Sequence, residues 1–140
     1  MEIIYELDEI ESAAKQFLNL VKDFRICAFS GDLGAGKTTF ISQLCRLMGV
    51  TETVTSPTYS IIQEYRTTHK NEIIYHIDLY RINDEEEARN AGIEDSIQSG
   101  EICWVEWPEK VSTIFPEKTV YAHFQNISAN KRKLIVELPA

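Results

Sequence analysis

The residues with the clearest chemistry form a glycine-rich octapeptide, Gly-Asp-Leu-Gly-Ala-Gly-Lys-Thr, at positions 31–38. This segment matches the phosphate-loop pattern G-x-x-x-x-G-K-[ST] at every fixed position. Glycines let the backbone approach a phosphate chain closely and adopt positive φ angles. The loop N–H groups then converge on phosphate oxygens where a helix begins. We therefore expect Lys37 to reach the β- and γ-phosphates of a nucleotide and the Thr38 hydroxyl to ligate Mg²⁺.

A site of this class also needs a carboxylate at the end of a neighbouring strand. Two β-rich runs end in one: residues 73–78 end in Asp78, and residues 102–106 end in Glu106. Glu106 is favoured for the metal-facing role because it closes the more continuous apolar run, which suits a strand covered on both faces. Asp78 would then orient water or a second group. For both residues, an inert acid at a strand end is the alternative.

The type of nucleotide is indicated by a missing pattern. The guanine-reading sequence Asn-Lys-x-Asp does not occur, and the nearest string, Asn-Lys-Arg-Lys at 130–133, lacks the acid. ATP is therefore the expected nucleotide. Hydroxyl side chains at residues 55–59, Thr-Ser-Pro-Thr-Tyr, either sense a γ-phosphate or form a proline-containing turn that leads into a strand.

The elements that must position these residues follow from hydrophobic spacing and turn residues. Asp8 is expected to cap the first helix, Gly49 to end the second, and Asn83 or Asp84 to cap a short acidic helix that ends near Gly92. Strands are expected over residues 2–7, 25–30, 58–66, 72–80, 101–106, 119–127 and 131–138, and the two longer helices over residues 10–21 and 37–48.

This order of elements predicts an α/β fold. Alternating strands and helices followed by hairpins indicate a three-layer phosphate-loop NTPase-like domain with a mixed, partly parallel sheet and antiparallel hairpins. A length of 140 residues without a linker or composition break predicts one domain over residues 1–140. Trp104 is expected in the core, and His76 is expected to be a packed or hydrogen-bonded strand residue rather than a base.

Charge and composition exclude several functions. The net charge is −8, from 22 acidic and 14 basic residues, so the chain is not expected to bind DNA or to hold tRNA alone. The three cysteines show no disulfide or zinc pattern, and we expect them to be reduced and buried. No apolar run is long enough for a membrane span, and the acidic first residues do not suit a secretion signal, so a cytoplasmic protein is expected.

Four motifs together give a specific resemblance. Gly-Asp-Leu-Gly-Ala-Gly-Lys-Thr-Thr (31–39), Thr-Ser-Pro-Thr-Tyr (55–59), His-Ile-Asp-Leu-Tyr-Arg (76–81) and Glu-Trp-Pro-Glu-Lys (106–110) occur in one short chain. In order and spacing they resemble the TsaE (YjeE) family of bacterial ATPases over essentially the whole sequence. The resemblance implies a role in making N6-threonylcarbamoyladenosine in tRNA, with the partner subunits TsaB and TsaD. It also implies that ATP hydrolysis supports repeated cycles, chiefly inside that complex, and that tRNA is met only through it.

The resemblance also implies roles for individual residues. Lys37, Asp78 and Glu106 would be catalytic, and Thr38 and Glu106 would hold Mg²⁺. Arg132 would approach the nucleotide from the last hairpin, although Lys131 and Lys133 leave that register open. The implied nucleotide-binding set is Ser12, Gly34, Ala35, Gly36, Lys37, Thr38, Thr39, Trp107, Glu109 and Arg132.

Two other functions use the same loop. A small-molecule kinase would transfer the γ-phosphoryl group to an acceptor, but such kinases use an arginine-bearing lid, and only Arg81 and Arg89 occur between Arg66 and Arg132. A nucleotide-gated binding module would have no useful turnover by itself. A phosphate-release assay with and without partners distinguishes these alternatives from a partner-dependent ATPase.

Overall fold

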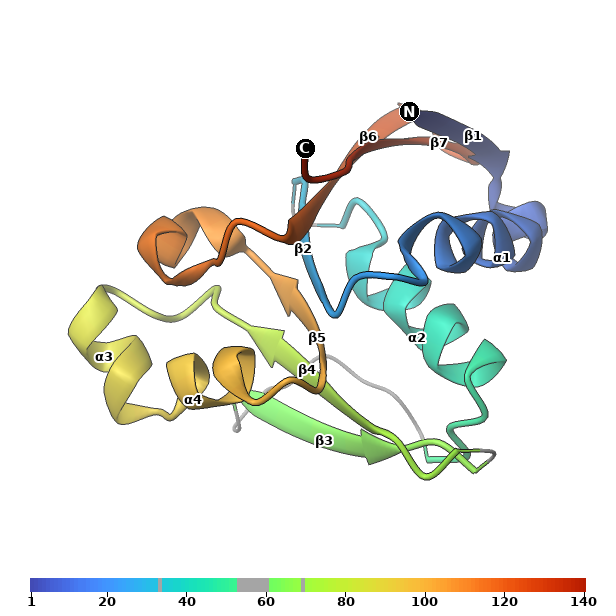
Figure 1. Ribbon diagram of the computed structural model, residues 1–140. Helices are drawn as coiled ribbons and strands as arrows, with labels where there is room; N and C mark the ends of the chain where they lie inside the picture. Colours follow the sequence, from blue (N-terminus) through green and yellow to red (C-terminus); the bar gives the residue numbers. More distant parts are fainter. Residues whose placement is uncertain (33, 53–60, 69) are drawn as a thin grey trace.

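One mixed sheet organises the chain in this computed structural model, which describes residues 1–32, 34–52, 61–68 and 70–140 (Figure 1). Within these residues the strand order is β1-β7-β6-β2-β5-β4-β3. The strands are β1 (Glu2–Glu6), β2 (Ile26–Ser30), β3 (Ile62–Arg66), β4 (Ile73–Asp78), β5 (Ile102–Glu106), β6 (Thr119–Ser128) and β7 (Lys131–Glu137).

The central pairings of this sheet are parallel and the outer pairings are antiparallel. Strand β2 runs parallel to β5 and to β6, and β4 runs parallel to β5. The pairs β1–β7, β6–β7 and β3–β4 are antiparallel. The predicted mixed sheet and both predicted hairpins are confirmed. Parallel neighbours bring the carboxyl ends of β2, β4 and β5 to the same edge of the sheet, where the phosphate loop begins.

Helices cover both faces of the sheet, which confirms the predicted three-layer arrangement (Figure 1). Helices α1 (Ile10–Val21) and α2 (Lys37–Leu47) lie on one face. Helices α3 (Glu85–Asn90) and α4 (Ile93–Gln98) and the 3₁₀ segment η2 (Pro108–Ile114) lie on the other. Among the described residues, we find no helix with the length and apolar character that crossing a membrane requires.

Several boundaries differ from the sequence predictions. Asp8 does not cap α1, because it lies inside a 3₁₀ turn, η1 (Leu7–Glu9), whose preceding Glu6 N–H donates to Glu9 Oε1 at 3.4 Å. Asp84 is the cap of α3, since its side chain accepts from Glu87 N at 2.9 Å. Helix α4 and η2 were not predicted. The hydroxyl-rich segment 55–59 and the expected start of a strand at Thr58 lie outside the described residues.

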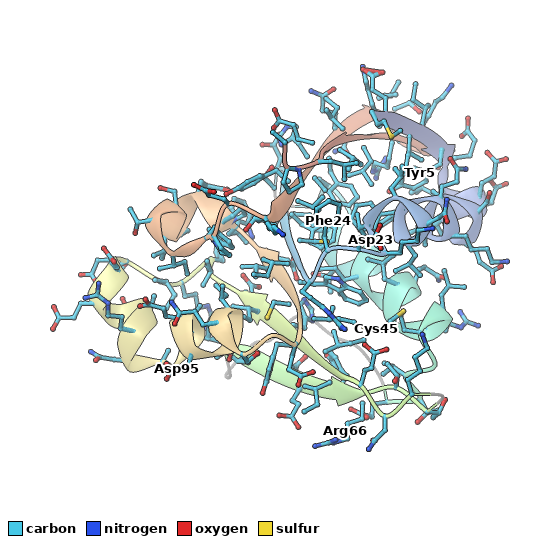
Figure 2. All side chains as sticks on the ribbon, viewed as in Figure 1. Tyr5, Asp23, Phe24, Cys45, Arg66 and Asp95 are labelled. Atoms are coloured by element: carbon cyan, nitrogen blue, oxygen red, sulfur yellow. The ribbon has the colours of Figure 1, made fainter. Side chains whose placement is uncertain are left out.

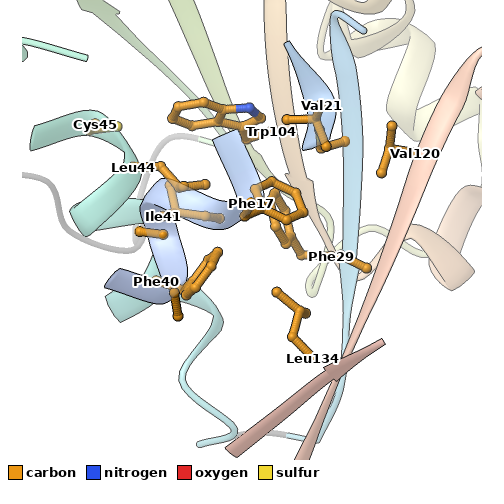
Figure 3. Packing of buried hydrophobic residues seen from close by; sticks show 14 of the residues in the cluster. Phe17, Val21, Phe29, Phe40, Ile41, Leu44, Cys45, Trp104, Val120 and Leu134 are labelled. Carbon is orange, nitrogen blue, oxygen red and sulfur yellow. The ribbon is translucent and has the colours of Figure 1, made fainter. Parts of the chain in front are cut away.

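The core under α1 and α2 is built on aromatic rings. Phe17 packs against Phe29 and Phe40, with ring centroids 5.5 and 5.6 Å apart (Figure 3). Phe124 extends the cluster, 5.3 Å from Phe40. Trp104 is buried in the same layer, as predicted. Because Phe40 belongs to the first turns of α2, this packing fixes the helix start that follows the phosphate loop.

The remaining side chains follow the usual division, with small residues buried between the layers and charged residues on the surface. All three cysteines are free and buried, as predicted. Cys45 lies on the inner side of α2, whereas Arg66 and Asp95 extend into solvent (Figure 2). The second core layer, under α3, α4 and η2, contains mainly isoleucine and valine side chains.

Candidate nucleotide site

The loop that connects β2 to α2 has the backbone that its glycines predict. Gly34 and Gly36 adopt positive φ angles of 82° and 95°, and Gly36 is the residue before the first turn of α2. Gly31 has a φ of 141° and lies so close to β6 that a Cβ there would meet Phe124 O at 3.0 Å. The loop is thus held against the sheet at its first residue and wound into a helix start at its last.

The Lys37 side chain folds back onto the phosphate loop. Its ammonium donates to the carbonyl oxygen of Gly31 and, at 3.2 Å, to that of Asp32. It also lies 3.8 Å from the ring centroid of Trp107, a cation–π distance. Burial lowers the pKa of Lys37, and the nearby carboxylates, Glu106 foremost, oppose that shift. The Lys37 ammonium is therefore surrounded by loop carbonyls, an indole ring and nearby carboxylates.

Thr38 and Glu106 meet across the sheet edge. Thr38 Oγ1 lies 3.0 Å from Glu106 Oε1 and 3.1 Å from Oε2. Glu106 is only 3% exposed and also lies 2.7 Å, through Oε2, from His76 Nε2. In sheet register Glu106 stands opposite Asp78, since β4 and β5 are parallel. The two carboxylates that end the apolar runs are therefore neighbours at the loop.

Trp107 turns the chain sharply as it leaves β5. It adopts a left-handed backbone, φ 60° and ψ 52°, which is rare for a non-glycine residue and is often found at functional sites. Its N–H donates to Phe29 O at 3.2 Å, and its ring lies 4.9 Å from that of Tyr80. This turn brings the indole over Lys37.

Arg132 reaches the loop from the last hairpin. Its Nε lies 4.0 Å from the position that a Cβ on Gly36 would occupy. Nη1 donates to the carbonyls of Ser128, Ala129 and Lys131 at 2.9, 3.3 and 3.2 Å. The Nε atom is buried, with no hydrogen-bond partner among the described residues. A strong cationic donor thus stands beside the loop with its buried Nε–H unpaired among the described residues.

A hollow of about 370 Å³ adjoins this loop. Its polar lining includes two side-chain amides of β6 and a histidine whose Nδ1 lies 2.8 Å from Ser30 Oγ. The lining residues are Asp32, Ala35, His123, Phe124, Gln125 and Asn126. The hollow places hydrogen-bonding groups next to the phosphate loop.

Comparison with known proteins identifies the family. The family model described as "Threonylcarbamoyl adenosine biosynthesis protein TsaE" matches residues 4–134. A Rickettsia bellii protein named tRNA threonylcarbamoyladenosine biosynthesis protein TsaE is 32% identical over 131 residues, which cover 93% of this chain and 89% of that protein. The chain belongs to the TsaE family.

Other relatives and one solved structure agree with this placement. The TsaE protein of Bacillus subtilis is 31% identical over 127 residues, covering 91% of this chain and 78% of that protein. The TsaE protein of Haemophilus influenzae is 44% identical over 91 residues, covering 65% of this chain and 56% of that protein. The crystal structure of Bacillus subtilis YdiB superposes with a TM-score of 0.75 over all of this chain and 87% of that one, at 23% identity. That likeness supports the fold.

The residues implied by the TsaE resemblance are mostly brought together. Lys37, Thr38, Glu106, Trp107 and Arg132 surround the loop through the contacts given above. Thr39 is exposed on the first turn of α2, and Glu109 is exposed just after Trp107, close enough for its charge to act on Lys37.

Ser12 is placed differently. It is an exposed residue of α1, and its side chain forms no hydrogen bond within the described part of the chain. Its expected place near adenine stays a prediction.

Two residues inside the quoted motifs, Tyr80 and Lys110, received no role from the sequence. The Tyr80 ring packs against Trp107 with the ring planes tilted by 50°, and Lys110 lies 5.6 Å from the Tyr80 ring centroid. Tyr80 belongs to the motif at 76–81 and Lys110 to the motif at 106–110, so membership of these motifs is the signal that could have identified them. Asp78 itself accepts from Tyr80 N at 2.9 Å, which shapes this turn.

Proposed function

We propose that this chain binds and hydrolyses ATP with Mg²⁺ and, with TsaB and TsaD, supports the synthesis of N6-threonylcarbamoyladenosine in tRNA. The observation that carries the proposal is the contact between Thr38, in the first turn after the phosphate loop, and the buried Glu106 carboxylate. The partners come from the family resemblance. The same role places the protein in the cytoplasm, where tRNA is modified.

The residues at the loop suit magnesium held mainly by a nucleotide. A threonine hydroxyl and one carboxylate are oxygen ligands of the kind Mg²⁺ prefers, and Mg²⁺ usually takes few protein ligands and keeps phosphate oxygens and waters. Among the described residues, no group of three or more His, Cys, Asp or Glu side chains could hold a metal ion alone. Thr38 and Glu106 would hold the ion, which would neutralise charge on the transferred phosphoryl group.

The chain's own residues would divide the remaining work. Lys37 supplies a positive charge for the β- and γ-phosphate oxygens, and the loop N–H groups hold the phosphates at the start of α2. Arg132 offers its free Nε–H on the side of Gly36. Asp78, which pairs with Glu106 in strand register, would orient the attacking water. ATP is preferred over GTP in this proposal because no guanine-reading acid follows Asn130 and Lys131.

The test is phosphate release from ATP by the purified chain, alone and with purified TsaB and TsaD. We expect slow release alone and faster release with both partners. Lys37→Ala should abolish release, because the charge on the β- and γ-oxygens is lost, and Lys118→Ala, a lysine between η2 and β6, serves as the matched control. Unchanged release by Lys37→Ala would refute the proposal. Competition binding with Mg²⁺ should favour ATP over GTP.

The same assay separates the competing functions. A small-molecule kinase would phosphorylate an added acceptor without either partner. A nucleotide-gated module would bind ATP and join its partners with no phosphate release in any mixture. Either result would replace the proposed hydrolase activity.

A further inference from the structure

His76 is a buried polar residue in the middle of the sheet. Its side chain is fully inaccessible on β4, on the face that carries Ile74 and Asp78. The Tyr65 ring packs beside it, with centroids 6.2 Å apart. A buried imidazole needs a hydrogen-bond partner to offset its lost hydration. The partner that it has is Glu106.

The geometry of this contact fixes which nitrogen carries the hydrogen. His76 Nε2 lies 2.7 Å from Glu106 Oε2. A carboxylate accepts only, so Nε2 must donate. Nδ1 is buried and has no partner among the described residues. A neutral imidazole carries one N–H, so when Nε2 donates, Nδ1 holds a lone pair and no hydrogen. The Nε2–H tautomer is the one that the site favours.

His76 distinguishes the two oxygens of Glu106, and Thr38 does not. The Thr38 hydroxyl is 3.0 Å from Oε1 and 3.1 Å from Oε2, so its single hydrogen does not set the rotation of the carboxylate. The His76 contact involves Oε2 alone. Because His76 engages Oε2 alone, Oε1 is the oxygen that has Thr38 as its only hydrogen-bond partner among the described residues. In the parallel register His76 stands opposite Trp104, which lies two residues before Glu106 on the same face of β5. His76 therefore reaches the carboxylate along that face of the sheet.

We propose that His76 is a positioning residue that locks the Glu106 carboxylate so that Oε1, beside Thr38, faces the magnesium of a bound nucleotide. This inference rests on the proposed function. Groups that orient a ligating side chain typically change metal affinity by about 10- to 100-fold when they are removed. The effect should therefore appear in magnesium-dependent binding and not in nucleotide binding as such.

The experiment measures the dissociation constant of ATP by calorimetry, once with Mg²⁺ and once with EDTA, under conditions without turnover. His76→Phe keeps the ring and removes the donor. It should weaken Mg²⁺–ATP binding about 10-fold or more, with binding in EDTA unchanged within about twofold. His76→Gln, whose amide N–H can occupy the Nε2 position, should restore most of the loss. Ile74→Val, on the same strand and face, is the packing control.

A double-mutant cycle tests whether His76 acts through the Glu106 carboxylate. In a Glu106→Gln background, His76→Phe should cause little further loss, because the carboxylate that it orients is gone. Equal weakening with and without Mg²⁺, no rescue by His76→Gln, or full additivity would each overturn the inference. If the wild-type chain binds no nucleotide, the proposed function itself fails. That outcome is distinct from the three that overturn the inference about His76.

A second readout needs neither nucleotide nor a stable variant. Long-range ¹H–¹⁵N NMR of the wild-type chain reports which histidine nitrogen is protonated. We expect His76 as the Nε2–H tautomer, with its resonance displaced by Glu106→Gln. An Nδ1–H tautomer would overturn the inference even if His76→Phe fails to fold.

Discussion

Strand alternation separates three consecutive basic residues of β7. Arg132 lies on the side of Leu134 and Val136, which are buried, and its Nε comes close to Gly36. Lys133 has the opposite orientation and pairs with Glu2 at 3.1 Å. Arg132 therefore lies beside the loop, and its approach to a bound nucleotide stays a prediction.

Arg132→Ala should weaken ATP binding about 10- to 100-fold, since a charge-assisted hydrogen bond typically contributes about 1.5–3 kcal/mol. Lys133→Ala should change it less than twofold, because an exposed ion pair contributes little. Both constants are measured by calorimetry at one ionic strength. Equal losses would indicate a diffuse effect of charge and not a contact.

Asp78 and Glu106 stand side by side and differ in burial. Glu106 is enclosed by Thr38 and His76, whereas Asp78 is half-buried at the turn into Tyr80. This contrast supports a metal role for Glu106 and a water-orienting role for Asp78.

Glu106→Gln should weaken ATP binding mainly when Mg²⁺ is present. Asp78→Asn should keep Mg²⁺–ATP affinity within a few-fold and lower turnover in the TsaB–TsaD mixture by about 10²–10⁴. Titrations with and without Mg²⁺, together with phosphate release, measure both effects. The reverse pattern would exchange the two roles.

At the scale of elements, the loop depends on β6 as much as on its own glycines. Gly31 packs against the Phe124 backbone, so an added Cβ would meet Phe124 O at 3.0 Å and Phe124 Cβ at 3.1 Å. Gly92, between α3 and α4, also has a positive φ, of 79°, but has open space around it. The two positions separate steric crowding from backbone strain.

Gly31→Ala should therefore destabilise the protein by about 1–3 kcal/mol more than Gly92→Ala, because overpacking is added to strain. Urea unfolding of both variants gives the comparison. Gly31→Ala should also lower ATP affinity, since the loop would have to move away from β6. Equal destabilisation of the two variants would show that β6 can move away from the added Cβ at no cost in unfolding free energy.

The elements with strong spacing were predictable, and those fixed by distant contacts were not. Helices α1 and α2 follow an apolar periodicity of their own, and the loop between β2 and α2 has a chemical pattern, so both could be located. Helix α4 and η2 are short, and packing against the second core layer stabilises them, which no local signal reveals. The site residues were found by motif, whereas the bond between His76 and Glu106 depends on strand pairing.

Three buried thiols make the free energy of unfolding of the protein sensitive to alkali. Burial raises the pKa of Cys45 and of Cys103 to about 12, and also raises that of Cys27, from an ordinary value of 9.0. A raised folded pKa contributes stability that is fully present below the unfolded pKa and is lost as pH rises towards the folded one. The window of loss therefore opens near pH 9.

The urea midpoint should fall between pH 8 and pH 10, with each thiol contributing up to about 1.4 kcal/mol per pH unit above 9. Lys37 acts in the opposite direction, because its pKa is lowered by burial. Cys45→Ala therefore serves as an internal reference: its stability should decline less steeply with pH than that of the wild type. If the urea midpoints of Cys45→Ala and the wild type declined equally with pH, the thiols would not be responsible for the loss of stability.

The position of β1 at the edge of the sheet determines when the protein can finish folding. Glu2 pairs with Ile135, and Tyr5 pairs with Arg132, so β1 can pair only after β7, which follows all the other strands of this sheet in the chain. Strand β2, which leads into the loop, likewise needs β5 and β6. Pairings this distant form slowly. The phosphate-loop motif is therefore synthesised well before the strands that flank β2, and the competent site forms only once β5 and β6 have been made.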